Sequence, residues 1–150
     1  MRLILAAAFA VTPVLALAQD NSVEQDALKA RQGYMAAISA NMGPLAAMAK
    51  GDVEYDEAQA VFHANNLAAL GNYEVEMHFL PGTAQGEFEG SNALAKTWEN
   101  LDDVRAKHDD FKVAAAAAPE GVKGGPAQVG AVVQSLGGTC KACHDNYRAK

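Results

Sequence analysis

Apolar side chains recur every three or four residues along three stretches of the chain, which is the spacing of one face of an α-helix. These stretches run from 28 to 49, from 94 to 115 and from 129 to 147, and a less regular one runs from 56 to 79. Glycine and proline separate the four at Lys50-Gly51, at Pro81-Gly82 and between Pro119 and Pro126. The pattern predicts an all-α fold, an antiparallel four-helix bundle with up-down-up-down topology.

The start of the chain has the pattern of a secretory signal peptide. Arg2 gives a positive start, an apolar run follows to Leu15, and Ala16-Leu17-Ala18 places small residues before a cleavage point. The run is too short to span a membrane, and no second run of spanning length follows it. We therefore expect residues 1–18 to be removed and 19–150 to form one domain, exported to a bacterial periplasm as a soluble protein without a membrane anchor.

Composition and charge narrow the classes of partner. Half of the 150 residues are hydrophobic, which is enough for a core in a single domain. The formal net charge is −6, and removal of Arg2 with the leader makes it −7, with the acidic residues scattered along the chain. This acidic balance argues against nucleic acid and anionic membranes as partners.

The last stretch contains the sequence Cys140-Lys141-Ala142-Cys143-His144, which is the pattern of c-type haem attachment. Two cysteines three residues apart share one face of a helix, so both thiols can reach the two vinyl groups of one porphyrin. His144 follows Cys140 by four residues on the same face and can serve as the axial ligand of the iron. Few residues follow His144, so a ligand on the opposite side of the iron has to come from upstream.

Three other interpretations of the two cysteines compete with haem attachment. A zinc site needs two more good ligands, and the chain has no second cysteine pair. A dithiol oxidoreductase normally has a βαβ context, and no strands are evident. A disulfide is chemically reasonable in an exported protein, but three-residue spacing on a continuous helix strains its geometry. The pattern favours haem.

The chain resembles the cytochrome c′ family along essentially its whole mature length. The resemblance is carried by Arg31-Gln32, Met35, Asn41-Met42, Lys50-Gly51, Pro81-Gly82-Thr83, Trp98 and the closing run from Cys140 to Arg148. It implies a four-helix bundle with one covalent haem c near the C-terminus and His144 as the only strong axial ligand of the iron. It also implies an apolar distal side that binds nitric oxide and carbon monoxide, and a homodimer formed through the first two helices.

Several site residues follow from this comparison together with helical spacing. Arg31 is a charge on an apolar helix face and needs a partner, for which a haem propionate is the natural choice. The alternative is an arginine at the end of the bundle whose charged group reaches water. The resemblance adds Gln32 as a polar neighbour of the same propionate. Met35, one turn after Arg31, is expected on the distal side of the iron, either as a wall or as a ligand. Asn92 is expected to cap the third helix, with a weaker expectation of contact with the haem.

The remaining candidates lie on the third and fourth helices. Trp98 is expected to pack against the porphyrin edge, and Tyr147 to pack near the haem. The resemblance places Arg148 near the proximal face, although an ordinary solvated arginine at a helix C-terminus is an equal alternative. His108 is expected to be a polar core residue with satisfied hydrogen bonds rather than a ligand.

Two main functions remain open at this level. The first is a high-spin, gas-binding cytochrome with five-coordinate iron, which Arg31 and the apolar distal face favour. The second is a low-spin electron carrier with Met35 as the sixth ligand, exchanging electrons with a periplasmic redox partner. An enzyme such as a peroxidase is disfavoured, because no distal His–Arg pair is evident. We expect a non-enzymatic protein.

Overall fold

The computed structural model describes residues 22–150 of the chain. The expected signal peptide and its cleavage site therefore lie outside the described residues. Within the described part the fold is helical, and its elements are α1 (Val23–Lys50), α2 (Glu57–Gly71), a 3-10 helix η1 (Val75–His78), α3 (Lys96–Glu99), α4 (Leu101–Gly121) and α5 (Pro126–Tyr147).

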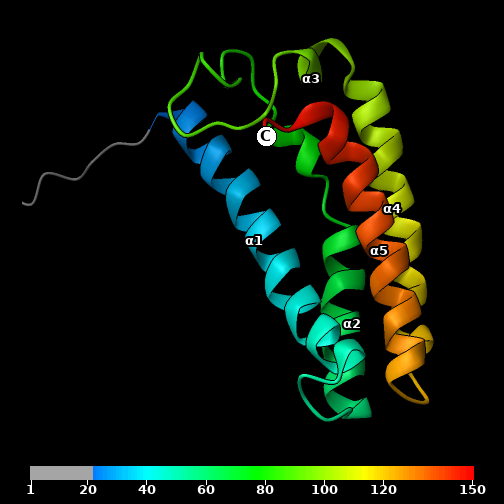
Figure 1. Ribbon diagram of the computed structural model, residues 1–150. Helices are drawn as coiled ribbons and strands as arrows, with labels where there is room; N and C mark the ends of the chain where they lie inside the picture. Colours follow the sequence, from blue (N-terminus) through cyan, green and yellow to red (C-terminus); the bar gives the residue numbers. More distant parts are fainter. Residues whose placement is uncertain (1–21) are drawn as a thin grey trace, which may run out of the picture.

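The four long helices form the predicted antiparallel bundle (Figure 1). Each packs on its neighbour in the chain, and the first also packs on the last, so the circular order is α1, α2, α4, α5. In Figure 1, α1 leans away from α5 toward the end of the bundle that carries the C-terminus, which we call the upper end. None of the helices in residues 22–150 is long and apolar enough to cross a membrane.

Local sequence sets the helix ends. The side chain of Ser22 accepts a hydrogen bond from Gln25 N at 3.2 Å, and that of Asp56 accepts one from Gln59 N at 3.0 Å, so both α1 and α2 begin with a side-chain cap. Gly51 ends α1 with φ +77°, a left-handed conformation that glycine adopts without strain. Pro126 is the first residue of α5, where its missing N–H costs no hydrogen bond.

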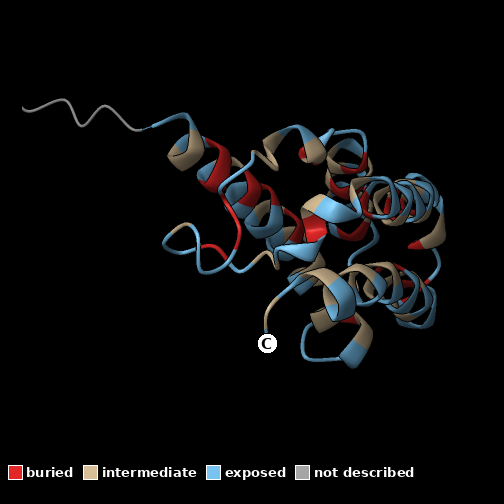
Figure 2. Ribbon diagram, turned by 90° about the horizontal axis from the view of Figure 1, so that it is seen from above, coloured by how far each residue is buried: buried red, intermediate tan, exposed pale blue. Residues whose placement is uncertain are grey.

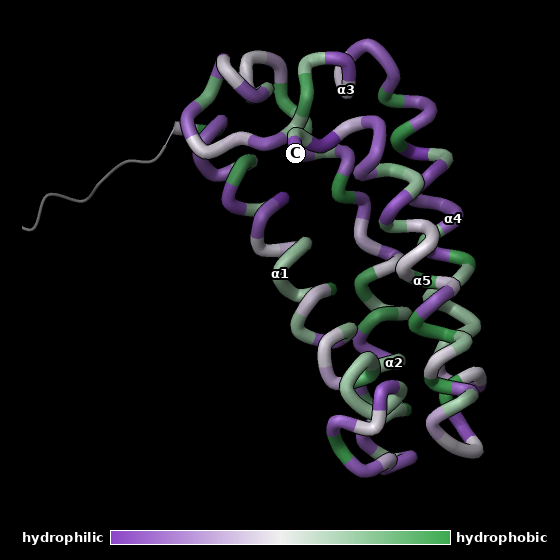
Figure 3. Tube along the Cα trace, viewed as in Figure 1, coloured by the Kyte–Doolittle hydropathy of each residue, from purple (hydrophilic) through white to green (hydrophobic). Residues whose placement is uncertain are grey.

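The core is concentrated at the lower end of the bundle. Buried residues lie on the sides of the helices that face other helices (Figure 2), and hydrophobic positions alternate with hydrophilic ones along each helix (Figure 3). The residues with no exposed surface include Leu45, Ala60, Ala64, Leu67, Ala115, Ala118, Val122, Val129 and Leu136. Alanine on α2 and α4 lets those two helices approach closely, and the larger side chains of α1 and α5 fill the space between them.

Three predicted boundaries were wrong. The second helix ends at Gly71 instead of continuing to Phe79, and η1 follows it after a turn. The third helix runs past Pro119 to Gly121. It also starts later than predicted, because Asn92 does not cap it: the segment around Asn92 pairs instead with the end of the chain, through an isolated bridge between Ala93 and Arg148.

Candidate functional site

The last turns of α5 hold the predicted attachment residues beside two adjoining cavities at the upper end of the bundle. The first cavity has a volume of about 290 Å³ and the second about 400 Å³, which is the scale of ligand sites in proteins. Cys140 lines the second cavity, whereas Cys143 and His144 line both. The residues common to both walls are Met35, Phe79, Val104, Cys143, His144 and Arg148. Because they share so much wall, the two cavities form one site between α1 and α5.

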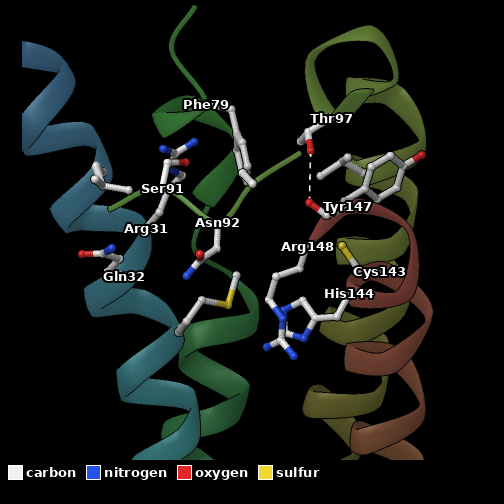
Figure 4. Close-up of a pocket in the computed structure, with 14 residues that line it drawn as sticks. Arg31, Gln32, Phe79, Ser91, Asn92, Thr97, Cys143, His144, Tyr147 and Arg148 are labelled. Carbon is white, nitrogen blue, oxygen red and sulfur yellow. Dashed lines mark hydrogen bonds between the residues drawn. The ribbon is translucent and has the colours of Figure 1, made fainter. Parts of the chain in front are cut away.

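Burial controls the ionisation of the attachment residues. It raises the pKa of the Cys140 and Cys143 thiols, which are not joined in a disulfide. Burial, and secondarily the charge of Arg148, lowers the pKa of His144 below its ordinary value of 6.5. The imidazole is therefore neutral at neutral pH, which is the form that binds a metal. Figure 4 shows His144 and Arg148 side by side on the cavity wall.

Arg31 is the buried cation of the site. It is 5% exposed, and its guanidinium lies 4.8 Å from the ring centre of Phe79 and 5.6 Å from that of Trp98. Its Nη2 donates a hydrogen bond to the carbonyl oxygen of Thr83 at 3.1 Å. Its Nη1 has no hydrogen-bond partner in the described part of the chain. The residue therefore keeps an unused donor at the wall of the first cavity.

Polar groups of the long connection between η1 and α3 lie beside Arg31 and Gln32. Ser91 Oγ donates to the same Thr83 carbonyl at 2.7 Å, and Gln32 Nε2 donates to the carbonyl of Gly90 at 3.1 Å. Asn92 is exposed but lines the first cavity, as Gln32 does, and its carbonyl accepts a hydrogen bond from Ala149 N. Figure 4 shows Arg31 and Gln32 on α1 facing this connection.

The end of the chain closes the upper side of the site. The carbonyl of Tyr147 accepts a hydrogen bond from Leu94 N at 2.9 Å and a longer one from Thr97 Oγ1 at 3.4 Å (Figure 4). Its phenol donates to Asp103 Oδ2 at 2.5 Å. These bonds hold Tyr147 and Arg148 at the first cavity, which both residues line.

Trp98 stands behind the cavity wall, because it lines neither cavity. Its Nε1–H is shared between the carbonyls of Phe79 and Leu80, at 3.0 and 2.9 Å. Its ring meets that of Phe79 edge to face, with centres 5.7 Å apart. Phe79 does line both cavities, so Trp98 contributes to the site by positioning Phe79.

Met35 and His108 differ in chemical character and in the cavities that they line. Met35 is 41% exposed and lines both cavities. His108 lines the second cavity, with Nε2 2.9 Å from Tyr34 Oη and Nδ1 2.9 Å from Glu76 Oε1. Both ring nitrogens of His108 thus have polar neighbours, which agrees with its predicted role as a polar core residue.

Within residues 22–150, no group of three or more His, Cys, Asp or Glu side chains is arranged to hold a metal ion.

Comparison with known proteins shows the family of the chain. The sequence profile of the family described as Cytochrome C′ matches residues 26–148. The chain belongs to the cytochrome c′ family. A cytochrome c′ from Cereibacter sphaeroides is 38% identical to it over 149 residues, which are 99% of this chain and 98% of the relative.

Solved structures of cytochromes c′ share the fold. That from Rhodobacter spheriodes has a TM-score of 0.80 and 38% identity, covering 85% of this chain and 98% of its own. A nitric oxide complex of a cytochrome c prime variant from Alcaligenes xylosoxidans has a TM-score of 0.72 and 27% identity, covering 87% and 100%. A cytochrome c′ whose dimer dissociation is ligand-controlled has a TM-score of 0.75 and 29% identity, covering 87% and 98%.

Cytochromes c′ carry one covalent haem c, and the site fits that group. The two cysteines and a neutral imidazole face a largely apolar space, and the unused Nη1 donor of Arg31 suits an anionic propionate. A further observation concerns Gly137, which lines the second cavity. A Cβ atom added there would meet nothing within 4 Å, so the protein leaves room beside the attachment motif.

Sequence reasoning missed several residues of the cavity walls. Phe79 lies at the end of the least regular apolar stretch, from 56 to 79, and neither Glu76 nor Tyr34 was predicted to belong to the site. The only available signal was that Tyr34 and His108 fall on helix faces that turn inward, where a polar group needs a partner. Glu76 gave no such signal, because its place in a short 3-10 helix follows no helical period.

Proposed function

We propose that this protein is an exported mono-haem cytochrome whose iron is five-coordinate, binds nitric oxide and carbon monoxide, and also transfers electrons. In this proposal Cys140 and Cys143 form the thioether bonds to the porphyrin, and His144 is the axial ligand. Arg31 and Gln32 anchor the propionates. The haem supplies a redox-active iron with one coordination position open to a small gas.

The character of the wall around His144 supports an open iron. The thioether and imidazole side chains that line the second cavity with His144 are those of Met35, Met42 and His108. Met42 packs against the buried core of the bundle. His108 is engaged by Tyr34 and Glu76 through both nitrogens. Met35 lines both cavities, and in this proposal its flexible, unbranched thioether serves as a movable apolar wall. This single observation carries the proposal.

In this proposal other residues of the cavity walls exclude water and set the charge around the iron. Phe79 and Val104 keep water from the iron by lining both cavities. Burial keeps the His144 imidazole neutral and available to the metal. Arg148, on the same wall, places a positive charge beside that imidazole. The nitric oxide complex of the Alcaligenes xylosoxidans relative supports gas binding by this fold.

The optical spectrum of the purified holoprotein tests the proposal. We expect a broad high-spin spectrum in both oxidation states, which changes promptly when carbon monoxide is added to the reduced protein. We also expect Met35→Leu to leave the iron five-coordinate, because leucine replaces one apolar wall with another. Sharp low-spin bands in the unaltered protein that become high-spin in Met35→Leu would overturn the proposal.

That contrary result would establish the second candidate function, a low-spin electron carrier with the sulfur of Met35 as sixth ligand. It is kept because Met35 lies on the shared wall of both cavities with His144. Insensitivity to carbon monoxide would accompany it.

We also propose a cellular location, an oligomeric state and a redox partner for the protein. The predicted signal peptide supports a periplasmic location, and the relative with ligand-controlled dimer dissociation supports a homodimer. A one-electron carrier of the periplasm is the expected redox partner. We propose no enzymatic activity, since His108, the imidazole that joins His144 on the cavity walls formed by residues 22–150, already has Glu76 and Tyr34 as neighbours.

A further inference from the structure

Three polar side chains form a buried chain on the wall of the second cavity. Tyr34 comes from α1, His108 from α4 and Glu76 from η1, so three separate elements meet there. The side chains of His108 and Glu76 are only 11% and 7% exposed. The same cavity is lined by Cys140, Cys143 and His144, which places this trio beside the haem attachment residues.

The contacts of the trio allow more than one arrangement of its protons. The Tyr34 hydroxyl lies 3.2 Å from the carbonyl oxygen of Leu70 and 2.9 Å from His108 Nε2, and its single proton can be donated to either of them. The other nitrogen of His108, Nδ1, faces Glu76 Oε1 at 2.9 Å. Two lone pairs at that distance repel each other, so one proton belongs between Nδ1 and Oε1, and a second can be carried on Nε2.

With the second proton on Nε2, the Glu76–His108 pair is electrically neutral as a unit. It is either an imidazolium with a carboxylate or a neutral imidazole with a carboxylic acid, and the two forms share one proton count. Loss of the proton leaves one buried negative charge. That charge is poorly compensated, since neither oxygen of Glu76 has a well-aligned hydrogen bond from any group within residues 22–150.

The surroundings of the pair contain few other charges. On α1 the residues facing the cavity are uncharged, and Tyr34 is held neutral because burial, then Glu76 and Cys140, raises its pKa. From α4 comes Lys107, 3.6 Å from Asp103, and from α5 come His144 and Arg148. Beside η1, the exposed Tyr73 stacks on His78 and lies 5.5 Å from the Tyr34 ring.

We propose that the Glu76–His108 pair is a redox-linked proton site, which takes up one proton from solvent when the haem accepts one electron. The electron comes from a one-electron reductant, the periplasmic carrier in the cell or an electrode in the laboratory. The reduced haem has one positive charge fewer, so the buried negative charge of the deprotonated pair loses its compensation. Protonation of the pair restores neutrality, and no covalent bond other than N–H or O–H changes.

The coupling has a definite sign. The oxidised haem favours the deprotonated pair, and the reduced haem favours the protonated pair. By linkage the reduction potential therefore falls as pH rises through the range in which the pair titrates. For one proton per electron the limiting slope is about 59 mV per pH unit.

The test is a spectroelectrochemical titration of the holoprotein between about pH 4.5 and pH 9, a range that spans the ordinary pKa values of glutamate and histidine. The unaltered protein is compared with the double variant Glu76→Gln/His108→Gln, which keeps hydrogen-bonding groups but holds no titrating proton. We expect the pH-dependent step to disappear in the double variant. In Glu76→Gln alone we expect an altered pH-dependent step, because the variant removes the buried carboxylate of the pair.

Glu74→Gln is the matched control. Glu74 lies two residues from Glu76 and is exposed, so the variant removes the same charge without touching the buried pair. We expect its pH-dependent step to coincide with that of the unaltered protein. A step that survives unchanged in Glu76→Gln/His108→Gln would overturn the proposal and assign the proton to another group, such as a propionate.

Direct proton uptake by the unaltered protein gives a second test that does not depend on how the variants fold. The holoprotein is reduced at an electrode in weak buffer containing a pH indicator. Within the pH range of the step, we expect uptake approaching one proton per electron. Uptake of no proton there, or a potential that does not vary with pH, would refute the proposal whatever the coordination of the iron proves to be.

Discussion

At the scale of single residues, Arg31 holds the loop side of the site together. It is buried, its Nη2 binds the Thr83 carbonyl, and its guanidinium lies against the rings of Phe79 and Trp98. Since Ser91 donates to the same carbonyl, one backbone oxygen links α1 to both ends of the turn between Thr83 and Ser91. A substitution of Arg31 therefore affects both stability and the haem.

We predict that Arg31→Ala destabilises the holoprotein by about 1–3 kcal/mol, the usual cost of leaving a buried hydrogen-bonding partner unpaired. We also expect a shifted reduction potential, since a propionate loses its cation. Urea unfolding and a redox titration measure the two effects.

Arg105→Ala is the control for Arg31→Ala. Arg105 pairs with Asp102 at 3.1 Å, but both side chains are more than half exposed. The expected change in unfolding free energy is below about 0.5 kcal/mol. An unchanged potential and haem spectrum in Arg31→Ala would contradict its role as the propionate partner.

Tyr34 gives a prediction about pH. Burial and Glu76 raise its pKa in the folded state above the ordinary value of 10, so the phenol stabilises the fold below that pH and loses this contribution as pH rises further. We expect Tyr34→Phe to be less stable than the unaltered protein by about 1 kcal/mol at pH 8. The gap should narrow between about pH 10 and pH 12. Urea unfolding at each pH checks this, and a constant gap would contradict it.

The positions of some site residues could be predicted from the sequence, and those of others could not. That Cys140, Cys143 and His144 lie on one cavity wall was predictable, because residues three and four apart share a helix face. Arg31 was predictable as a charge on an apolar helix face. Glu76 was not, because only the packing of η1 against α1 and α4 turns its carboxylate inward. The position of Trp98 behind Phe79 likewise depends on the path of a loop, which has no periodicity.

At the scale of helices, α2 and α4 approach each other closely at Gly71. At Gly71, an added Cβ would lie 3.2 Å from Lys112 Cα and 3.3 Å from Ala115 Cβ. Backbone cannot move aside as a flexible side chain can, so this glycine sets the distance between the two helices.

We predict that Gly71→Val destabilises the protein by about 1–3 kcal/mol through overpacking. The control is Gly33→Ala on the exposed face of α1, where an added Cβ would meet nothing within 4 Å. That substitution should stabilise the protein by about 0.5–1 kcal/mol, because alanine has the higher helix propensity. Urea unfolding compares them, and equal effects of the two would contradict the close approach.

The helices themselves were predicted well and their ends less well. The periodic stretches became α1, α4 and α5, because burial of one face dominates over local propensity. The second helix was too long in the prediction, since Asn72 and the turn after it end α2 before the apolar residues of η1. The late start of α4 has a tertiary cause, the pairing of residues 92–94 with the end of the chain.

At the scale of the whole molecule, the outer face of α2 is where a second copy is expected. Phe62 is 56% exposed there, with His63 edge-on at 5.2 Å between ring centres. Exposed aromatic residues are enriched in protein interfaces. The face belongs to the first two helices, through which the resemblance implied dimerisation.

We predict that Phe62→Glu converts the proposed dimer to a monomer, measured by size-exclusion chromatography with light scattering. Val113→Glu is the control, since Val113 is 72% exposed on α4 and the change in polarity is similar. A dimer that survives in Phe62→Glu, or is lost equally in Val113→Glu, would place the interface elsewhere.

The hydrogen bonds from Leu94 N to the Tyr147 carbonyl and from Ala149 N to the Asn92 carbonyl also have a consequence for the order of assembly. Both join segments that are more than fifty residues apart in the sequence, whereas the hydrogen bonds within a helix are local. A contact between distant segments requires a long loop to be closed first, so it is expected to form after the helices. The upper side of the site would then close last, and the interval would leave the porphyrin a way to the two cysteines.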